Sequence, residues 1–518
     1  MQRLGMRGVR RGLSTAKLTQ EEIVRSCKEH TMWSWSAQKA VDPIVMTRSE
    51  NIYFWDANGK KYTDVNSQLM CSNIGHQHPK VIQAIKDQAD KLCYAGPSMA
   101  TEIRAEFGPL LAARTPGNLN KFFFTLGGSE ANENAIKLAR LHTGRNKIIA
   151  RYKSYHGGTH GSMMLTGDPR RWANETGGGM SGVIRAFDPY MYRSLLYRPG
   201  MSEEEFSAII LRQLEEQIIY ENPNRCVARP LCRSLARSLA RLLVCASCSP
   251  SPPSLPSPLS PLSPLSPHHN PRTPTPHLTR SIAAMFIETV TGTNGLIPPP
   301  KGYLPGLRAL LSKYGILMVC DEVMCGLGRT GDWFAAETFG VVPDLITMAK
   351  GITSAYLPLG VVAISPEIAA SFDEKPFFGG LTYMAHPLCV AAAVATLKVL
   401  DEERVIQNVK QVGPHLRRRL DELKDRHACV GDVRSVGMFS CLELVKSKTT
   451  KEPLAPYNAT SPAVGAINKY MKDHGLYVFT AWNILHVNPP LITTAAQIDE
   501  IVAVIDKALD IGDQHATA

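Results

Sequence analysis

The 518-residue sequence lacks the long apolar runs and the regularly spaced cysteines that mark membrane proteins and small disulfide-bonded proteins. No run of 18 or more apolar residues is present, so no membrane-spanning helix is expected. Four of the twelve cysteines lie in one segment and the others are scattered among apolar residues, which indicates buried thiols in a reduced compartment. Cys245 and Cys248 are followed by two adjacent histidines instead of spaced ones, so no metal site is predicted.

Outside two segments, the chain also has no excess of positive charge. The net charge is +11, but residues 1–17 carry five basic side chains and no acid, and residues 226–281 carry six arginines and no acid. The rest of the chain is therefore neutral, and no nucleic acid partner is expected. Residues 1–17 resemble a mitochondrial transit peptide, which predicts the mitochondrial matrix. The alternative is an unstructured basic terminus on a cytoplasmic protein.

Residues 226–281 interrupt the pattern of the chain. Their part 250–276 is a Pro/Ser/Leu tract with eleven of the 36 prolines, which forms polyproline II or stays disordered and cannot build a core. We interpret 226–281 as an insertion without function, or a mispredicted coding segment, because its removal leaves a continuous α/β chain. The alternative is a basic helix face that contacts a membrane surface or a partner, formed by Arg229, Arg233, Arg237 and Arg241.

Two short apolar runs each end on a polar side chain. The run 315–320 leads to Asp321, and the run 345–349 leads to Lys350. Runs of this length are typical of buried parallel strands, and chemistry in open α/β sheets lies at the carboxyl ends of the strands. An acid and a lysine there indicate a pyridoxal phosphate (PLP) site, with a Schiff-base lysine and an acidic partner for the pyridine nitrogen. The alternative is an ordinary buried Asp–Lys pair.

Two further turns could contact such a cofactor. The predicted strand 121–126 runs into Gly127, Gly128 and Ser129 and then into a helix. Glycines at that turn let the backbone approach an anion, and the helix amino terminus favours its negative charge. The alternative is a tight turn with Ser129 as helix cap, and the spacing does not predict an ATP site. Tyr155, after the predicted strand 148–150, could lay its ring on a planar cofactor or simply pack on the core.

The order of the elements predicts an α/β protein. A large domain with a mainly parallel central sheet is expected over residues 76–395, interrupted by 226–281. A smaller α+β domain is expected from residues 18–75 and 396–518, after the targeting segment 1–17.

Several motifs together make the chain resemble the class III (omega) aminotransferases, which are PLP-dependent transferases of fold type I. The match runs from about Trp33 to Ile511, apart from the insertion. The motifs that carry it are Asn73–Pro79, Gly127–Glu133, Tyr155–Gly157, Glu288–Val290, Asp321–Val323, Pro343–Gly351, Leu357–Gly360, Gly380–Tyr383, His386–Pro387 and Asn488–Leu491.

The resemblance implies roles for these residues. The catalytic pair would be Lys350, which carries the cofactor, and Asp321, which keeps the pyridine nitrogen protonated. Thr382 would reach the cofactor phosphate of the neighbouring subunit, which implies a homodimer with shared active sites. The remaining cofactor contacts would be Gly128 and Ser129 at the phosphate, Tyr155 and Val323 on the two ring faces, Glu288 close to Asp321 and the cofactor hydroxyl, and His156 beside Tyr155 in the chain.

The substrate residues are less defined by the sequence. The chain looks most like the taurine–pyruvate and omega-amino acid–pyruvate branch, which implies a donor of the taurine, β-alanine or 4-aminobutyrate type and pyruvate as acceptor. Trp35 and Trp482 could wall the donor pocket or be plain packing residues. Related enzymes often carry an acceptor-binding arginine before Pro489, but Ala481 stands about where it is expected. An aminomutase, racemase or decarboxylase of the same fold, or an inactive homologue acting as an interaction protein, are the alternatives.

Overall fold

The computed structural model describes residues 18–175, 179–221 and 281–517. The predicted targeting segment and residues 226–280 of the predicted insertion lie outside the described residues. None of the described helices is both long and apolar enough to cross a membrane.

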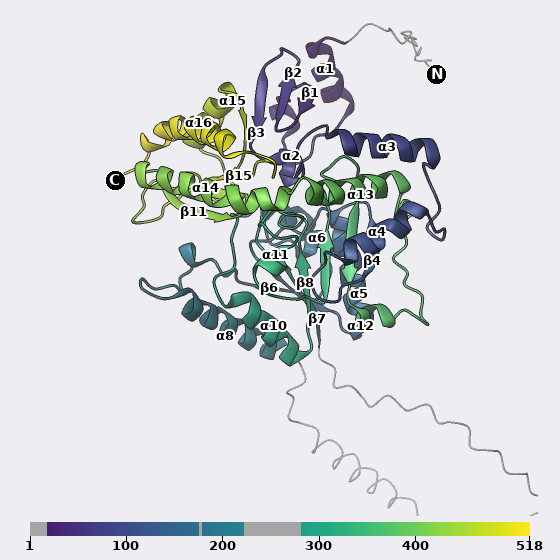
Figure 1. Cartoon of the computed structure of the whole chain (residues 1–518). Helices are drawn as coiled ribbons and strands as arrows, with labels where there is room; N and C mark the ends of the chain where they lie inside the picture. Colours follow the sequence, from purple (N-terminus) through teal and green to yellow (C-terminus); the bar gives the residue numbers. More distant parts are fainter. Residues whose placement is uncertain (1–17, 176–178, 222–280, 518) are drawn as a thin grey trace, which may run out of the picture.

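A seven-stranded sheet forms the centre of the larger part of the molecule (Figure 1). Strands β6, β5, β7, β8 and β9 are parallel, whereas β10 is antiparallel to both of its neighbours, β9 and β4. The strands, in their order across the sheet, are β4 (Lys121–Thr125), β10 (Gly360–Ile364), β9 (Leu345–Met348), β8 (Leu317–Asp321), β7 (Ile282–Glu288), β5 (Lys147–Arg151) and β6 (Val183–Ala186). The structure thus has the mainly parallel central sheet that the sequence predicts.

The central strands are buried on both faces, which explains their continuous apolar sequences. Side chains alternate between the two faces, so that Met318 and Cys320 of β8 join one hydrophobic core and Val319 joins the other. Helix α5 (Gly128–Thr143) contributes to the core of Val319. The opposite core contains residues of α4 (Glu102–Ala112), α8 (Glu203–Glu221), α10 (Tyr303–Tyr314), α13 (Pro387–Glu402) and α14 (Val405–Arg426).

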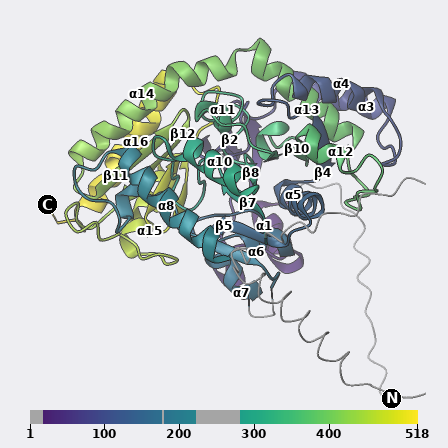
Figure 2. The same ribbon diagram turned by 90° about the horizontal axis from the view of Figure 1, so that it is seen from below.

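Helix α13 packs against α3 (Pro79–Lys91) and α4, and Figure 2 shows these three helices together at one end of the molecule. Pro79 and Pro387 each occupy the first turn of their helix, where the missing N–H is not needed. The shorter helices are α1 (Gln20–His30), α2 (Ser67–Met70), α6 (His160–Leu165), α7 (Trp172–Glu175), α11 (Ala335–Thr338) and α12 (Pro366–Ala370).

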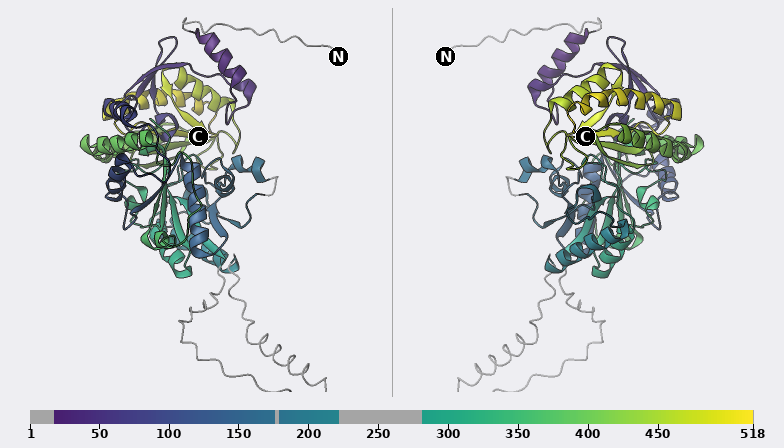
Figure 3. Two further views of the ribbon diagram at one scale, coloured as in Figure 1. Left: turned by 90° about the vertical axis from the view of Figure 1, so that its right-hand side faces the viewer. Right: turned by 90° about the vertical axis from the view of Figure 1, so that its left-hand side faces the viewer.

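The two ends of the chain build the smaller part of the molecule together. Strand β13 (Leu476–Tyr477) pairs in parallel with β3 (Lys61–Asp64). On its other side β3 pairs with β2 (Tyr53–Asp56), and β2 pairs with β1 (Met46–Glu50). Figures 1 and 3 show the amino-terminal strands beside the carboxyl-terminal helices α15 (Pro462–Asp473) and α16 (Ala495–Asp513). A second sheet has the order β11 (Val430–Val436), β12 (Phe439–Leu444), β15 (Ile484–Val487) and β14 (Phe479–Ala481).

Candidate active site

A cavity of about 890 Å³ lies at the carboxyl ends of β7, β8 and β9. The strand register places Glu288 directly opposite Asp321, and Asp321 opposite Thr347. Lys350 follows β9 by two residues and lines the same cavity. The apolar strands therefore bring the two predicted catalytic residues and Glu288 to one place, as expected for the carboxyl edge of an α/β sheet.

The Asp321 carboxylate is held in one orientation by three donors. Its Oδ2 atom accepts hydrogen bonds from Asn132 Nδ2 and His156 Nδ1, both at 2.8 Å, and Oδ1 accepts from the Val323 N–H at 3.0 Å. Thr347 donates to Asn132 Oδ1 at 2.8 Å, which fixes the amide. Asp321 is only 3% exposed, so these three hydrogen bonds take the place of the water that would solvate an exposed carboxylate.

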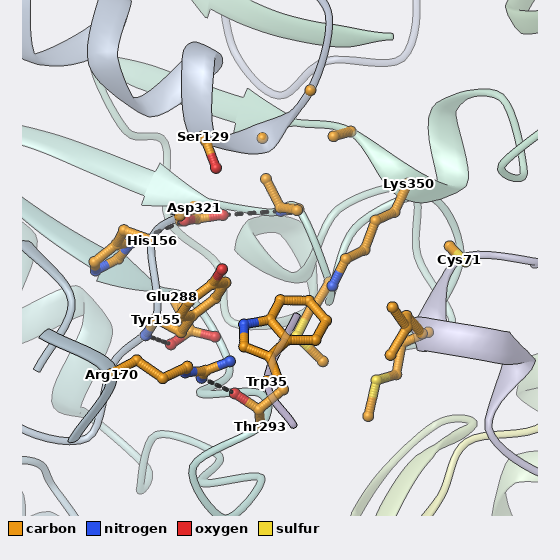
Figure 4. Close-up of a pocket in the computed structure, with 18 of the residues that line it drawn as sticks. Trp35, Cys71, Ser129, Tyr155, His156, Arg170, Glu288, Thr293, Asp321 and Lys350 are labelled. Carbon is orange, nitrogen blue, oxygen red and sulfur yellow. Dashed lines mark hydrogen bonds and ion pairs between the residues drawn. The ribbon is translucent and has the colours of Figure 1, made fainter. Parts of the chain in front are cut away.

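Lys350 extends into the cavity from the side opposite to Tyr155 and Arg170 (Figure 4). Its backbone has φ +46°, a left-handed conformation that is rare for a residue with a side chain. Burial lowers the pKa of its ammonium group, and the nearby Cys71, Asp321 and Glu288 oppose this effect in part. Lys350 is thus closer to being a neutral amine than a lysine in water.

The Gly127–Ser129 turn leads into α5, a helix of 16 residues, and its first turn faces the cavity. Gly127 is the cap residue and no side chain caps the helix, so the alternative interpretation of Ser129 as helix cap is wrong. The Ser129 hydroxyl instead accepts a hydrogen bond from the Gly158 N–H at 2.9 Å. A Cβ atom on Gly128 would lie 2.9 Å from Val323, so only glycine fits there. This arrangement suits an anion at the helix amino terminus.

Glu288 connects the sheet to two cavity loops. Its carboxylate accepts hydrogen bonds from the N–H groups of Tyr155, at 2.9 Å, and Gly292, at 2.8 Å. Burial raises the pKa of the Glu288 carboxyl to about 7, and the neighbouring Asp321 adds to the rise. The loop after β5 carries Tyr155, whose ring lines the cavity.

Arg170 is a cavity residue that the sequence analysis missed. Its guanidinium carbon lies 3.7 Å from the centroid of the Tyr155 ring. The Nε atom donates to both carboxylate oxygens of Asp168, at 3.1 and 2.9 Å, and Nη2 forms an ion pair with Asp168 and donates to Thr293 Oγ1 at 3.0 Å. Arg170 and Lys350 are the two lysine or arginine side chains among the described residues that line the cavity.

Comparison with known proteins agrees with this geometry. The model of the family "Aminotransferase class-III" matches residues 35–219 and 275–509. The chain belongs to the class III aminotransferases. Members bind PLP, and the chain is accordingly a PLP-dependent transaminase of omega-amino acids or amines, with an amine donor and a keto acid as substrates.

Two solved structures are similar over nearly the whole aminotransferase chain. The taurine:2-oxoglutarate aminotransferase of Bifidobacterium kashiwanohense, in complex with PLP and glutamate, is 37% identical with a TM-score of 0.83, covering 97% of this chain and 100% of that chain. An (S)-enantioselective omega-transaminase from Thermomicrobium roseum is 30% identical with a TM-score of 0.80, covering 96% of this chain and 100% of that chain.

Curated relatives have similar activities. The putrescine–pyruvate aminotransferase of Pseudomonas aeruginosa is 30% identical over 478 residues, covering 90% of each chain. The mitochondrial gamma-aminobutyrate transaminase 1 of Oryza sativa subsp. japonica is 30% identical over 494 residues, covering 92% of this chain and 83% of the relative.

The residues of the aminotransferase cavity fit PLP. The buried Asp321 supplies a negative charge of the kind that a protonated ring nitrogen needs, and Lys350 supplies an amine. The uncapped start of α5, where Gly128 leaves no room for a side chain, supplies N–H groups for a phosphate.

Apolar side chains from both chain ends close the other side of the aminotransferase cavity. Trp35 and Trp482 both line it; Trp35 is 65% exposed, and Trp482 packs on Tyr457 with ring centroids 4.3 Å apart. Ala481 lines the cavity where the acceptor-binding arginine was expected. Leu69, Met70 and Phe479, from the same two parts of the chain, also line the cavity.

Thr382 is the one predicted cofactor residue that does not line this cavity. It is exposed, and its carbonyl oxygen accepts a hydrogen bond from the Tyr94 hydroxyl at 2.9 Å. Gly128, Ser129, Tyr155, His156, Glu288, Asp321, Val323 and Lys350 all line the cavity.

Proposed function

We propose that this transaminase moves the amino group of a short omega-amino acid, with a carboxylate or a sulfonate as its acid group, to pyruvate, and that Arg170 binds the acid group of each substrate. The observation that carries this proposal is the fixed guanidinium of Arg170 in the cavity that contains Lys350. An arginine is suited to such groups because its planar fork forms paired, charge-assisted hydrogen bonds.

Arg170 takes the place of the expected arginine before Pro489. Asp168, itself 1% exposed, and Thr293 hold its Nε and Nη2 atoms, whereas its Nη1 has no hydrogen-bond partner among the described residues. Asp168 also accepts from Asn294 Nδ2 at 3.1 Å, which disperses part of its charge. The guanidinium therefore keeps donors available for a ligand and stays in one position.

The number of cations in the cavity supports pyruvate as acceptor. Beside Lys350, Arg170 is the one strongly basic side chain among the described cavity residues. Pyruvate brings one carboxylate and pairs with it, whereas 2-oxoglutarate brings two and would leave one without a cationic partner. An unpaired carboxylate in a partly buried cavity costs about 1–3 kcal/mol. The similar enzymes include both types, one acting with pyruvate and one with 2-oxoglutarate.

Lys350 and Asp321 are proposed as the catalytic residues. Bound PLP supplies an electron sink for the carbon that carries the amine. Lys350, whose pKa is lowered by burial, would take the proton from the substrate carbon that carries the amine and would pass it to the cofactor carbon that holds the same amine. Asp321, fixed by Asn132 and His156, stabilises the positive charge on the pyridine nitrogen.

The remaining cofactor contacts belong to the same proposal. Gly128 and the Ser129 hydroxyl hold the phosphate, Tyr155 and Val323 cover the two ring faces, and His156 and Glu288 adjust the charge around Asp321. Trp35 and Trp482 close the donor side and exclude water from the reacting carbon. Their positions around one cavity support these roles.

A homodimer is proposed because Thr382 lies outside the cavity of its own chain. Exposed apolar side chains close to it in sequence or space suit a subunit interface, namely Tyr94, Phe378 and Tyr383. Thr382 would then reach the phosphate site of the partner.

A mitochondrial location is supported by residues 1–17 and by the mitochondrial relative from Oryza sativa.

A matrix of donors and acceptors tests the proposed reaction. Taurine, β-alanine, 4-aminobutyrate and propylamine are each combined with pyruvate or 2-oxoglutarate, and the new amino acid is quantified. We expect the acidic donors with pyruvate to give the highest kcat/KM, and no turnover without a keto acid. Turnover without a keto acid would indicate a mutase or racemase, and a preference for 2-oxoglutarate would refute the acceptor assignment.

The variant Arg170→Met tests the residue that selects the substrate. We expect it to raise the KM for β-alanine by about a hundredfold, the loss expected for a charge-assisted pair of about 3 kcal/mol, while the KM for propylamine changes little. Arg171→Met is the matched control, because Arg171 is the next residue and forms an ion pair with Glu175. An equal effect on both donors would contradict the proposal.

A further inference from the structure

Arg434 of β11 is a buried arginine that reaches from the carboxyl-terminal sheet to a cavity loop. Its Nε atom donates to the carbonyl oxygens of Gly295, at 2.7 Å, and Leu296, at 3.1 Å. Its Nη1 atom forms ion pairs with Glu443 at 2.7 Å and Asp432 at 2.6 Å. The guanidinium thus joins two acids of one sheet to two backbone carbonyls of another part of the chain.

The loop held by Arg434 is the loop that holds Arg170. Thr293 accepts the hydrogen bond from Arg170 Nη2, and Asn294 donates to Asp168, the carboxylate that binds the same guanidinium. The other end of the loop is fixed by the hydrogen bond from the Gly292 N–H to Glu288. A continuous path of hydrogen bonds and one short loop therefore runs from Arg434 to Arg170.

Arg434 is itself tightly fixed. It is 6% exposed, and its guanidinium carbon lies 4.9 Å from the ring centroid of Tyr190, which also contacts Glu443 through its hydroxyl. Buried arginines of this kind are held by their partners, so their carbonyl contacts transmit a defined position. A lysine in the same place could keep an ion pair with the acids but would lack the fork that also reaches the two carbonyls.

We propose that Arg434 is a positioning residue, which sets the place of the Arg170 guanidinium and thereby the selectivity of the enzyme for acidic substrates. This inference rests on the proposed role of Arg170. The effect of Arg434 falls mainly on the acid-binding side, because the residues between it and Arg170 lie on the loop after β7, whereas Asp321 ends β8 and Lys350 lies two residues after β9. Loss of the carbonyl contacts lets the loop move, so that the acid group of the substrate meets a displaced guanidinium.

The test compares Arg434→Lys with Arg193→Lys in the full-length holoenzyme. Arg193 is the matched control, because it also forms an ion pair with Glu443 but donates to the Lys451 carbonyl instead of the 292–296 loop. We expect Arg434→Lys to raise the KM for β-alanine and the inhibition constant of propanoate by about tenfold, the loss of one well-placed charged hydrogen bond. The KM for propylamine and the absorbance of the bound cofactor should stay unchanged, and Arg193→Lys should not show the selective rise.

A second variant tests the path without breaking buried ion pairs. Thr293→Val keeps the shape of the side chain and removes the oxygen that receives Arg170 Nη2, and it should show the same selective rise. The inference would be overturned if the KM for β-alanine and the KM for propylamine rose equally, or if neither variant raised the KM for β-alanine. An equal effect of Arg193→Lys would overturn it as well. Failure of Arg170→Met to lose acid selectivity would instead refute the proposed role of Arg170, so the two failures are distinguishable.

Discussion

At the scale of single residues, Glu288 differs from the acids around it. It is 4% exposed, and burial raises the pKa of its carboxyl from an ordinary 4.5 to about 7. The folded protein therefore binds this proton more tightly than the unfolded chain does. The stability that the proton contributes is complete below pH 4.5 and is lost as the pH rises to 7.

The variant Glu288→Gln removes this titration. In the apoenzyme, we expect the stability difference between wild type and variant to shift by about 3 kcal/mol in favour of the variant between pH 4.5 and pH 7. Urea unfolding at a series of pH values measures it. A difference that stays constant with pH would show that folding does not raise the pKa of the Glu288 carboxyl.

Residues also mark the limit of what the sequence predicts. Asp321 and Lys350 could be predicted to lie close together, as they do, because each follows an apolar run and neighbouring parallel strands end at one edge. The place of Arg170 could not be predicted, because its guanidinium is held by Asp168 and Thr293, which are far apart in the chain. The turn formed by Asp168 and Pro169 before Arg170 was the one available signal, and it gives no information about a cavity.

At the scale of elements, the start of α5 depends on one glycine. A Cβ atom at Gly128 would lie 2.9 and 3.0 Å from the two methyl carbons of Val323, a β-branched side chain with little freedom to move. We expect Gly128→Ala to lower the stability of the apoenzyme by about 1–3 kcal/mol, the usual cost of overpacking.

Gly127→Ala is the control for this element. Its backbone is extended, with φ −177°, and a Cβ atom there meets no other atom within 4 Å. Thermal unfolding of both apoenzymes gives the comparison. Equal midpoints for Gly128→Ala and the wild type would mean that Val323 and the helix start are not in contact.

Elements were predicted well where the local pattern decides the structure. Continuous apolar runs indicated β8 and β9, and the strands predicted before Gly127 and Tyr155 are β4 and β5. The direction of β10 could not be read from its sequence, because a doubly buried strand has the same composition in either orientation.

At the scale of the whole molecule, the two residues that flank the uncharacterised segment 222–280 lie side by side. The Ser281 hydroxyl donates to the Glu221 carbonyl oxygen at 2.5 Å, and the Lys147 ammonium donates to the same oxygen at 3.1 Å. The family model likewise matches the chain up to residue 219 and again from residue 275. The fold therefore joins α8 to β7 without needing the intervening residues.

Replacing residues 222–280 with a four-residue Gly/Asn turn should leave the enzyme intact. We expect the same kcat/KM for β-alanine and a melting temperature equal to or above that of the full chain, because a shorter loop costs less entropy to close. Steady-state kinetics and thermal unfolding measure both. Loss of activity in a folded variant would assign a function to the segment.

The proposed reaction depends on Lys350 being the residue that carries the cofactor. Borohydride reduction of the holoenzyme fixes the cofactor on the amine to which it is bound, and peptide mass spectrometry then locates it. We expect the pyridoxyl mass on the peptide that contains Lys350, and we expect Lys350→Ala to lose both this mass and transamination. The same mass on a different lysine, or transamination retained by Lys350→Ala, would contradict the proposed role of Lys350.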